Sequence, residues 1–140
     1  MLSITGRSLC LVLLPLVACQ EPPDISSQVQ EYGLLLSDSI FSGCDCPLDR
    51  GYDSKTECVN ARGTVNYQCQ DSVLQGHEES ANEYLSCAIP AVDAYVTCIE
   101  ADLGCEPGWF DACNEVWMKA EAKCPQLSSG LAVELDNCVQ

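Results

Sequence analysis

Positive charge and histidine are scarce in this 140-residue chain, which has six lysine and arginine residues and one histidine against 21 aspartate and glutamate residues. The scarcity of basic residues argues against nucleic acid or anionic lipid as a direct partner, because both are bound through positive charge. The single histidine, His77, excludes the His-x-x-x-His pair of zinc proteases and sites built on several histidines. The acidity predicts a well-hydrated surface, with attraction of a basic partner or of loosely held divalent cations as the alternative.

The residue patterns of common catalytic sites are also missing. The chain has no Gly-x-Ser-x-Gly motif, no glycine-rich phosphate loop and no Cys-x-x-Cys pair. His77-Glu78 could act as a base and its orienter beside a serine, but Gly76-His77-Glu78-Glu79 is typical of a polar loop ahead of a helix. We therefore expect a non-enzymatic protein with no catalytic residues and no cofactor.

Four carboxylates recur at every fourth position: Asp45, Asp49, Asp53 and Glu57. This spacing does not match the alternating oxygen ligands of an EF-hand loop, and a proline and a glycine between them interrupt any single helix face. We expect solvated loop carboxylates here rather than a calcium site, and no metal site elsewhere.

A hydrophobic run long enough to span a membrane is absent. The N-terminal apolar stretch, residues 9–17, is about half the roughly 20 residues that a spanning helix needs. It follows Arg7 and ends at the small residue Ala18, which is the layout of a secretory signal peptide. Once residues 1–18 are removed, the rest keeps five of the six basic residues and all 21 acidic ones, a net charge of −16.

The signal ends in Leu16-Val17-Ala18-Cys19, which resembles the lipobox of bacterial lipoproteins. The resemblance implies that Cys19 becomes the first residue and receives a diacylglyceryl group on its sulfur, and that two or three acyl chains give stable membrane attachment. In that family aspartate after the cysteine favours the inner membrane; Gln20 follows here, so the outer membrane is favoured. Residues 19–25 are then a short tether, and residues 26–140 form the domain, with a protein or envelope component as its expected partner.

Cysteine parity supports lipidation of Cys19. Cys10 leaves with the signal, and the eleven cysteines that remain are an odd number unless Cys19 is modified. Cleavage after Cys19 also leaves ten. A free secreted protein, including a secreted eukaryotic cysteine-rich helical protein, therefore stays open as an alternative.

The other ten cysteines, in an exported chain of this length, predict a disulfide framework rather than a metal site. They are Cys44, Cys46, Cys58, Cys69, Cys87, Cys98, Cys105, Cys113, Cys124 and Cys138. Cys44-Asp45-Cys46 is the one close pair, and an extracytoplasmic redox or metal-handling role for it is the rival interpretation. The negative charge of Asp45 disfavours a reactive thiolate, which favours structural cysteines.

Alternating strand patterns are absent, and the sequence predicts an all-α fold of about five short helices, stapled by disulfides around an antiparallel hairpin. The expected helices run over 26–41, from Ser54 to either Gly63 or Leu74, from Ser80 toward Gly104 with a kink at Pro90, over 109–123, and onward from Ser128 or Ser129. Ser27-x-x-Gln30, Ser54-x-x-Glu57 and Ser80-x-x-Glu83 are expected capping boxes. The residues expected to face inward are Ile25, Val29, Tyr32, Leu36, Ile40, Tyr84, Ala91, Tyr95, Val116, Trp117, Ala120, Leu131 and Leu135.

Three cysteine pairs share the spacing Cys-x10-Cys: Cys58 with Cys69, Cys87 with Cys98, and Cys113 with Cys124. Eleven residues make about three helical turns, so both sulfurs of a pair lie on one helix face, ~16 Å apart along the axis. A disulfide needs Cα atoms within about 7 Å. Each cysteine must therefore reach a neighbouring element, as in an antiparallel hairpin closed at two levels.

Two pairing schemes give the equal sums of residue numbers that an antiparallel register requires. One joins Cys87 to Cys124 and Cys98 to Cys113, and the other joins Cys69 to Cys87 and Cys58 to Cys98. The first is favoured because Gly104 and Pro107-Gly108 make a clear turn between its helices. The region 87–124 loosely resembles the twin Cys-x9-Cys helical hairpin proteins, with one extra residue in each helix; the resemblance implies two disulfides across the hairpin and nothing about function.

Overall fold

The computed structural model describes residues 21–101 and 104–140 and shows the expected all-α architecture. Its elements are α1 (Ser26–Gly43), the 3-10 turn η1 (Pro47–Arg50), α2 (Lys55–Arg62), α3 (Tyr67–Leu74), α4 (Glu78–Ala101), α5 (Trp109–Glu121) and α6 (Ser129–Asp136). Within these ranges β-type pairing is limited to one isolated bridge between Val65 and Val139. The expected signal peptide, Cys19 and the start of the tether lie outside the described residues.

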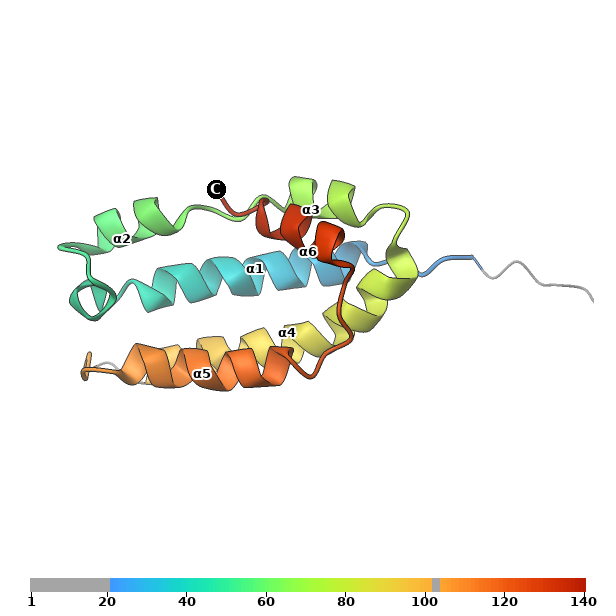
Figure 1. The fold of residues 1–140 in the computed structure, drawn as a ribbon. Helices are drawn as coiled ribbons and strands as arrows, with labels where there is room; N and C mark the ends of the chain where they lie inside the picture. The colour runs from blue at the N-terminus through green and yellow to red at the C-terminus, as the bar shows by residue number, and fades with distance from the viewer. Residues whose placement is uncertain (1–20, 102–103) are drawn as a thin grey trace, which may run out of the picture.

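The helices are arranged around α1, which lies in the middle of the molecule (Figure 1). The hairpin of α4 and α5 covers one side of α1, while α2, α3 and α6 lie on the other. α4 and α5 run in opposite directions, as the sequence predicts for the hairpin. α4 continues through Pro90 as one helix, and Figure 1 shows that its direction changes along its length.

The main core forms where α1, α4 and α6 meet. Val29 and Tyr32 of α1 face a row of small and apolar residues on α4, which includes Ala81, Leu85 and Ala88. Alanine side chains let two helix backbones approach closely, and the larger side chains fill the spaces between them. Complete burial of one leucine such as Leu85 stabilises the fold by about 2 kcal/mol.

Gly63 decides between the two boundaries expected for the second helix. It ends α2 with a φ of +83°, a conformation that glycine adopts at little cost, and α3 begins four residues later. Cys58 and Cys69 therefore lie on two separate helices, and the expectation that they share one helix face is wrong.

The expected caps are formed at some helices and replaced at others. The Ser54 hydroxyl accepts from the Glu57 N–H at 3.1 Å, and Ser128 caps α6 in the same way. The box at Ser27 is not formed, because Asp24 Oδ1 already accepts from the Ser26 N–H at 3.0 Å and the helix begins there. Where another residue caps the helix in place of the expected one, the helix start moves by one or two residues and the fold does not change.

Two further expectations about helix ends and faces are corrected. α4 begins at Glu78 rather than at Ser80, because the Glu78 carboxylate accepts from the Gly76 N–H at 2.7 Å and the Ser80 hydroxyl donates back to the His77 carbonyl. Val116, expected to face inward, is 63% exposed, since α5 turns only a narrow face toward α4. That face is made by Cys113 and Trp117.

Candidate functional site

All ten cysteines between residues 44 and 138 are joined in five disulfides. The bridges are Cys44–Cys58, Cys46–Cys105, Cys69–Cys138, Cys87–Cys124 and Cys98–Cys113. Their Cα–Cα distances, from 5.4 to 5.8 Å, lie in the ordinary range for a disulfide. Every helix that the structure describes carries a bridging cysteine within it or within three residues of its end, so the framework reaches all six of these helices.

Two of the five bridges are the pairs that the antiparallel register favours. Cys87–Cys124 and Cys98–Cys113 join the two helices of the α4–α5 hairpin at two levels, about three helical turns apart. Cys58 and Cys69 bond to Cys44 and Cys138 instead of to α4, so the competing scheme does not occur. The α4–α5 hairpin is thus closed by a disulfide near each of its ends.

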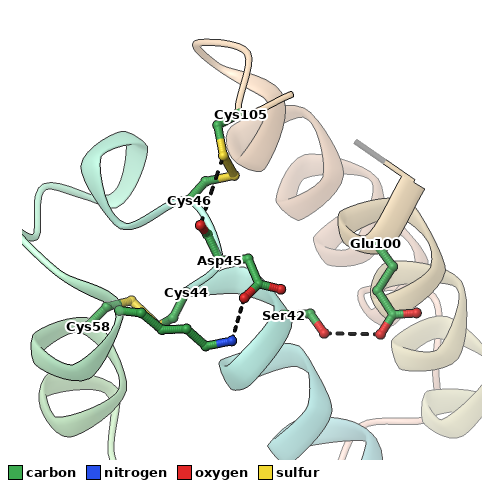
Figure 2. Close-up of polar contacts among 8 residues, drawn as sticks. Ser42, Cys44, Asp45, Cys46, Cys58, Glu100 and Cys105 are labelled. Atoms are coloured by element: carbon green, nitrogen blue, oxygen red, sulfur yellow. Dashed lines mark hydrogen bonds and ion pairs between the residues drawn. A yellow bond between two sulfur atoms is a disulfide. The ribbon is translucent and has the colours of Figure 1, made fainter. Parts of the chain in front are cut away.

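The two sulfurs of Cys44-Asp45-Cys46 diverge to different partners (Figure 2). Cys44 bonds to Cys58 of α2, and Cys46 bonds to Cys105, which lies between α4 and α5 in the chain. Both cysteines are buried, while Asp45 between them is exposed and forms an ion pair with Lys55. The motif is therefore a branch point of the framework, and it holds no pair of free thiols in this structure.

The carboxylates that recur every four residues do not converge. Asp45 pairs with Lys55, Asp49 accepts from the Gly108 N–H at 3.2 Å, and Glu57 accepts from the Asp53 N–H at 3.0 Å. Across residues 21–101 and 104–140, no group of three or more histidine, cysteine, aspartate or glutamate side chains is placed to hold a metal ion.

His77 also stands apart from the chemistry considered for it. It is exposed at the start of α4, and its backbone makes the local hydrogen bonds: its N–H donates to the Leu74 carbonyl and its carbonyl accepts from the Ser80 hydroxyl. Because the Ser80 hydroxyl is turned to the backbone of His77, it does not face the imidazole as a nucleophile would.

A groove that the sequence did not reveal lies between the α4–α5 hairpin and α6. It encloses about 310 Å³, at the low end of the range for small-ligand sites. Its lining consists of Tyr84, Met118, Glu121, Ala122, Gln126, Leu127, Ala132, Leu135 and Asp136. Polar and apolar groups line it in about equal measure, its two carboxylates are Glu121 and Asp136, and none of the lining residues is basic.

A buried chain of hydroxyls ends at this groove. The Tyr32 and Tyr84 oxygens are 3.0 Å apart, and the Tyr84 hydroxyl donates to Glu121 Oε1 at 2.9 Å. Since the one proton of Tyr84 is used on Glu121, the Tyr32 hydroxyl must donate to Tyr84. Burial raises the pKa of Tyr32 to about 12 and also raises the pKa of Tyr84, so both phenols stay neutral and keep Glu121 in one orientation.

Both tyrosines lie on the apolar helix faces that the sequence predicts, but no sequence pattern predicts the contact between them. Tyr32 and Tyr84 are 52 positions apart, and Glu121 is a further 37 positions along. A polar site of this kind becomes visible only once three helices are packed together. Its chemistry is that of an oriented carboxylate beside an apolar wall, which suits a cationic group on an aliphatic chain.

A second aromatic cluster supports the other end of the hairpin. The Trp117 ring stacks on Tyr95 with centroids 4.9 Å apart, and Arg50 lies over the Phe110 ring at 3.5 Å from its centroid. Burial lowers the pKa of Arg50, although guanidinium remains charged. Trp117, expected to face inward, and Trp109 are both half-buried, and each has a buried indole N–H without a hydrogen-bond partner among the described residues.

The fold and the cysteine framework together define the class of the molecule: a small, all-α protein stapled by five disulfides. No protein family, curated protein or solved structure gave a match to the chain. In the segments that the structure describes, no helix combines the length and apolar character needed to cross a bilayer.

Proposed function

We propose that this chain is a lipid-anchored extracytoplasmic protein whose helical domain binds a partner through an acidic surface. In this proposal residues 1–18 direct export, Cys19 carries the lipid, and residues 26–140 form a non-enzymatic interaction module at the cell envelope, with the outer membrane as the favoured site. The lipobox-like sequence Leu16-Val17-Ala18-Cys19 supplies the anchor.

The observation that carries the proposal is the closure of the cysteine set. The ten cysteines from Cys44 to Cys138 are bonded among themselves, which is typical of proteins exported to an oxidising compartment. None of the ten needs Cys19 as a partner. Without acylation, Cys19 would be an eleventh cysteine with no disulfide partner in an oxidising compartment, and acylation of its sulfur removes that free thiol.

Intact mass of the membrane-extracted protein tests this proposal. The expected mass is that of residues 19–140 with a diacylglyceryl group on Cys19 and ten hydrogens lost to five bridges. Cys19→Ala should release the protein from the membrane fraction, and Cys10→Ala, which changes a cysteine inside the signal, should leave attachment unchanged. An unmodified N-terminus in the membrane-extracted protein would refute the anchor.

The rival function, redox or metal handling by Cys44 and Cys46, makes a different prediction for the same sample. It requires two thiols that map to Cys44 and Cys46 in protein kept oxidised, whereas the interaction module has none. The burial of both sulfurs and their bonds to Cys58 and Cys105 favour the module.

The groove at Glu121 is the part of the module best suited to a basic side chain of the partner. The hydroxyl of Tyr84 fixes one carboxylate oxygen, Asp136 adds a second negative charge, and Leu127 and Leu135 can cover the methylene groups of a lysine. Nothing basic in the groove lining competes for this position.

The groove is tested with Nα-acetyl-lysine methylamide and its uncharged counterpart, Nα-acetyl-norleucine methylamide. Amide chemical shifts of α5 and α6 should move with the lysine compound and not with the norleucine compound. Glu121→Gln should remove the response, while Glu115→Gln, a change on the exposed face of the same helix, should leave it intact. Equal responses to both compounds would show that charge does not determine binding.

A further inference from the structure

One of the five disulfides differs from the others in its exposure. Cys105 is the one exposed cysteine among the ten that form bridges, while its partner Cys46 is 3% exposed. Each of the other four bridges joins cysteines that are buried or half-buried. Thiol–disulfide exchange requires a thiolate to reach a sulfur atom from solvent. The exposure of Cys105 is therefore a first difference between Cys46–Cys105 and the other four bridges.

The backbone at Cys105 is also held in an unfavourable conformation. Its φ of +52° is the one positive φ of a non-glycine residue in the described segments. A side chain crowds the backbone in this left-handed region, so the conformation persists where surrounding bonds impose it. Cutting the bridge at Cys105 removes one of those bonds and lets the residue relax, which favours the reduced form.

The rest of the fold does not depend on this bridge. Neither Cys46 nor Cys105 belongs to the two apolar clusters of the core. The end of α1 is also attached to the hairpin by the Ser42 hydroxyl, which donates to Glu100 Oε1 at 3.0 Å (Figure 2). The turn η1 that follows is attached by the contact of Arg50 with Phe110. Opening the bridge is therefore expected to be a local event.

We propose that Cys46–Cys105 is a thiol–disulfide exchange site, which a dithiol reductant opens while the other four bridges stay closed. The exchange reversibly frees the turn between α4 and α5 from the segment that follows α1. This inference rests on the described residues and is independent of the proposed lipid at Cys19.

The exchange proceeds in two steps that balance in atoms and electrons. A thiolate of the reductant attacks Cys105 Sγ, the bond between Cys105 and Cys46 breaks, and Cys46 leaves as a thiolate that takes a proton from water. The second thiol of the reductant then attacks its own sulfur in the mixed disulfide, which releases Cys105 as a thiol. The protein gains two electrons and two protons, and the reductant becomes a disulfide.

The experiment is graded reduction of the oxidised protein with dithiothreitol under native conditions, followed by alkylation and peptide mapping. Cys46 and Cys105 should be alkylated together, at least tenfold faster than any other cysteine, while the far-ultraviolet circular dichroism stays constant. First reduction of another pair, or release of all ten thiols at once, would overturn the proposal.

Two variants give the controls. Cys46→Ser/Cys105→Ser should lose the fast phase of alkylation and keep four bridges by mass. Cys98→Ser/Cys113→Ser should retain a fast phase that maps to Cys46 and Cys105, because the hairpin stays closed through Cys87–Cys124. If neither variant folds, the mapping on the unaltered protein still decides the question.

Discussion

At the residue scale, Gly33 shows why a helix can require glycine. It is buried in the middle of α1, where a Cβ atom would lie 2.7 Å from Tyr67 Cδ1 and 2.9 Å from Gln70 Oε1. Gln70 is itself 1% exposed, so neighbouring atoms enclose its side chain. The close contact between α1 and α3 thus depends on the missing side chain.

Gly33→Ala is therefore expected to destabilise the fold by about 1–3 kcal/mol, the usual cost of overpacking. Gly130→Ala in α6 is the matched control, because its Cβ would meet nothing within 4 Å. That change should stabilise the protein by up to about 1 kcal/mol through helix propensity. Urea unfolding of both variants measures the difference, and equal effects of the two changes would contradict the role assigned to Gly33.

The buried tyrosine pair predicts a loss of stability at alkaline pH. Burial raises the pKa of Tyr32 to about 12 in the folded protein, while the same phenol has an ordinary pKa of 10.0 when it is exposed in the unfolded chain. A raised folded pKa contributes stability that is fully present below pH 10 and is lost as the pH rises toward 12. Burial also raises the pKa of Tyr84 and of Tyr95, so both act in the same direction.

The measurement is the free energy of unfolding between about pH 9 and pH 11.5 for the unaltered protein and for Tyr32→Phe. The variant should lose less stability over this range, because one of the three buried phenols, those of Tyr32, Tyr84 and Tyr95, no longer ionises on unfolding. Tyr67→Phe, at an exposed tyrosine, should keep the original pH dependence. The same slope in all three proteins would show that burial of Tyr32 does not govern the alkaline limit.

At the scale of the elements, cysteine spacing predicts more than hydrophobic pattern does. The equal sums of residue numbers at Cys87–Cys124 and Cys98–Cys113 describe the α4–α5 hairpin because helical rise fixes the distance between its two levels. The third Cys-x10-Cys pair follows no such rule, since Gly63 turns the chain between Cys58 and Cys69.

Helix starts and the groove were beyond what the sequence could predict. Asp24 and Glu78 accept hydrogen bonds from backbone N–H groups near the helix starts. Several neighbouring serines are equally good N-cap residues by sequence, so the sequence does not decide which residue caps the helix. The groove requires α6 to be placed against α4 and α5, which is fixed in part by the Cys69–Cys138 bridge. Ten cysteines allow too many pairings for spacing alone to predict that bridge.

Removal of the inner hairpin bridge gives a prediction at this scale. Cys98 and Cys113 are 15 positions apart, so Cys98→Ser/Cys113→Ser should lose about 3 kcal/mol in the chain-entropy model. Cys69→Ser/Cys138→Ser opens a loop of 69 positions and should lose about 1 kcal/mol more. Urea unfolding of the oxidised variants checks the order, and the reverse order would show that loop length does not dominate.

At the scale of the whole molecule, uncompensated negative charge is the dominant electrostatic feature. The net charge of residues 19–140 is −16, and the described residues contain two ion pairs, Lys55–Asp45 and Lys119–Glu115. Mutual repulsion of carboxylates opposes a compact state, and the five disulfides oppose the expansion that repulsion favours. The disulfide framework therefore stabilises a highly acidic fold whose small hydrophobic core would compensate for this repulsion only in part.

This balance predicts that salt stabilises the folded protein. Raising the salt concentration from about 10 mM to about 100 mM shortens the Debye length from about 30 Å to about 10 Å, so repulsion between exposed carboxylates weakens. The urea midpoint should rise over this range. Sucrose at equal osmolality is the uncharged control for general solution effects.

Part of this repulsion arises between Glu79 and Glu83, which lie on one face of α4. Both are exposed and lie four positions apart in the first turns of α4, where like charges destabilise a helix by about 0.2–0.5 kcal/mol. Glu83→Gln should recover that amount, and Glu83→Lys should gain slightly more because it adds an attraction to Glu79. Both gains should fade as salt is raised, since they come from screened charges; a gain that persists in high salt would mean that the substitution acts through helix propensity or packing instead.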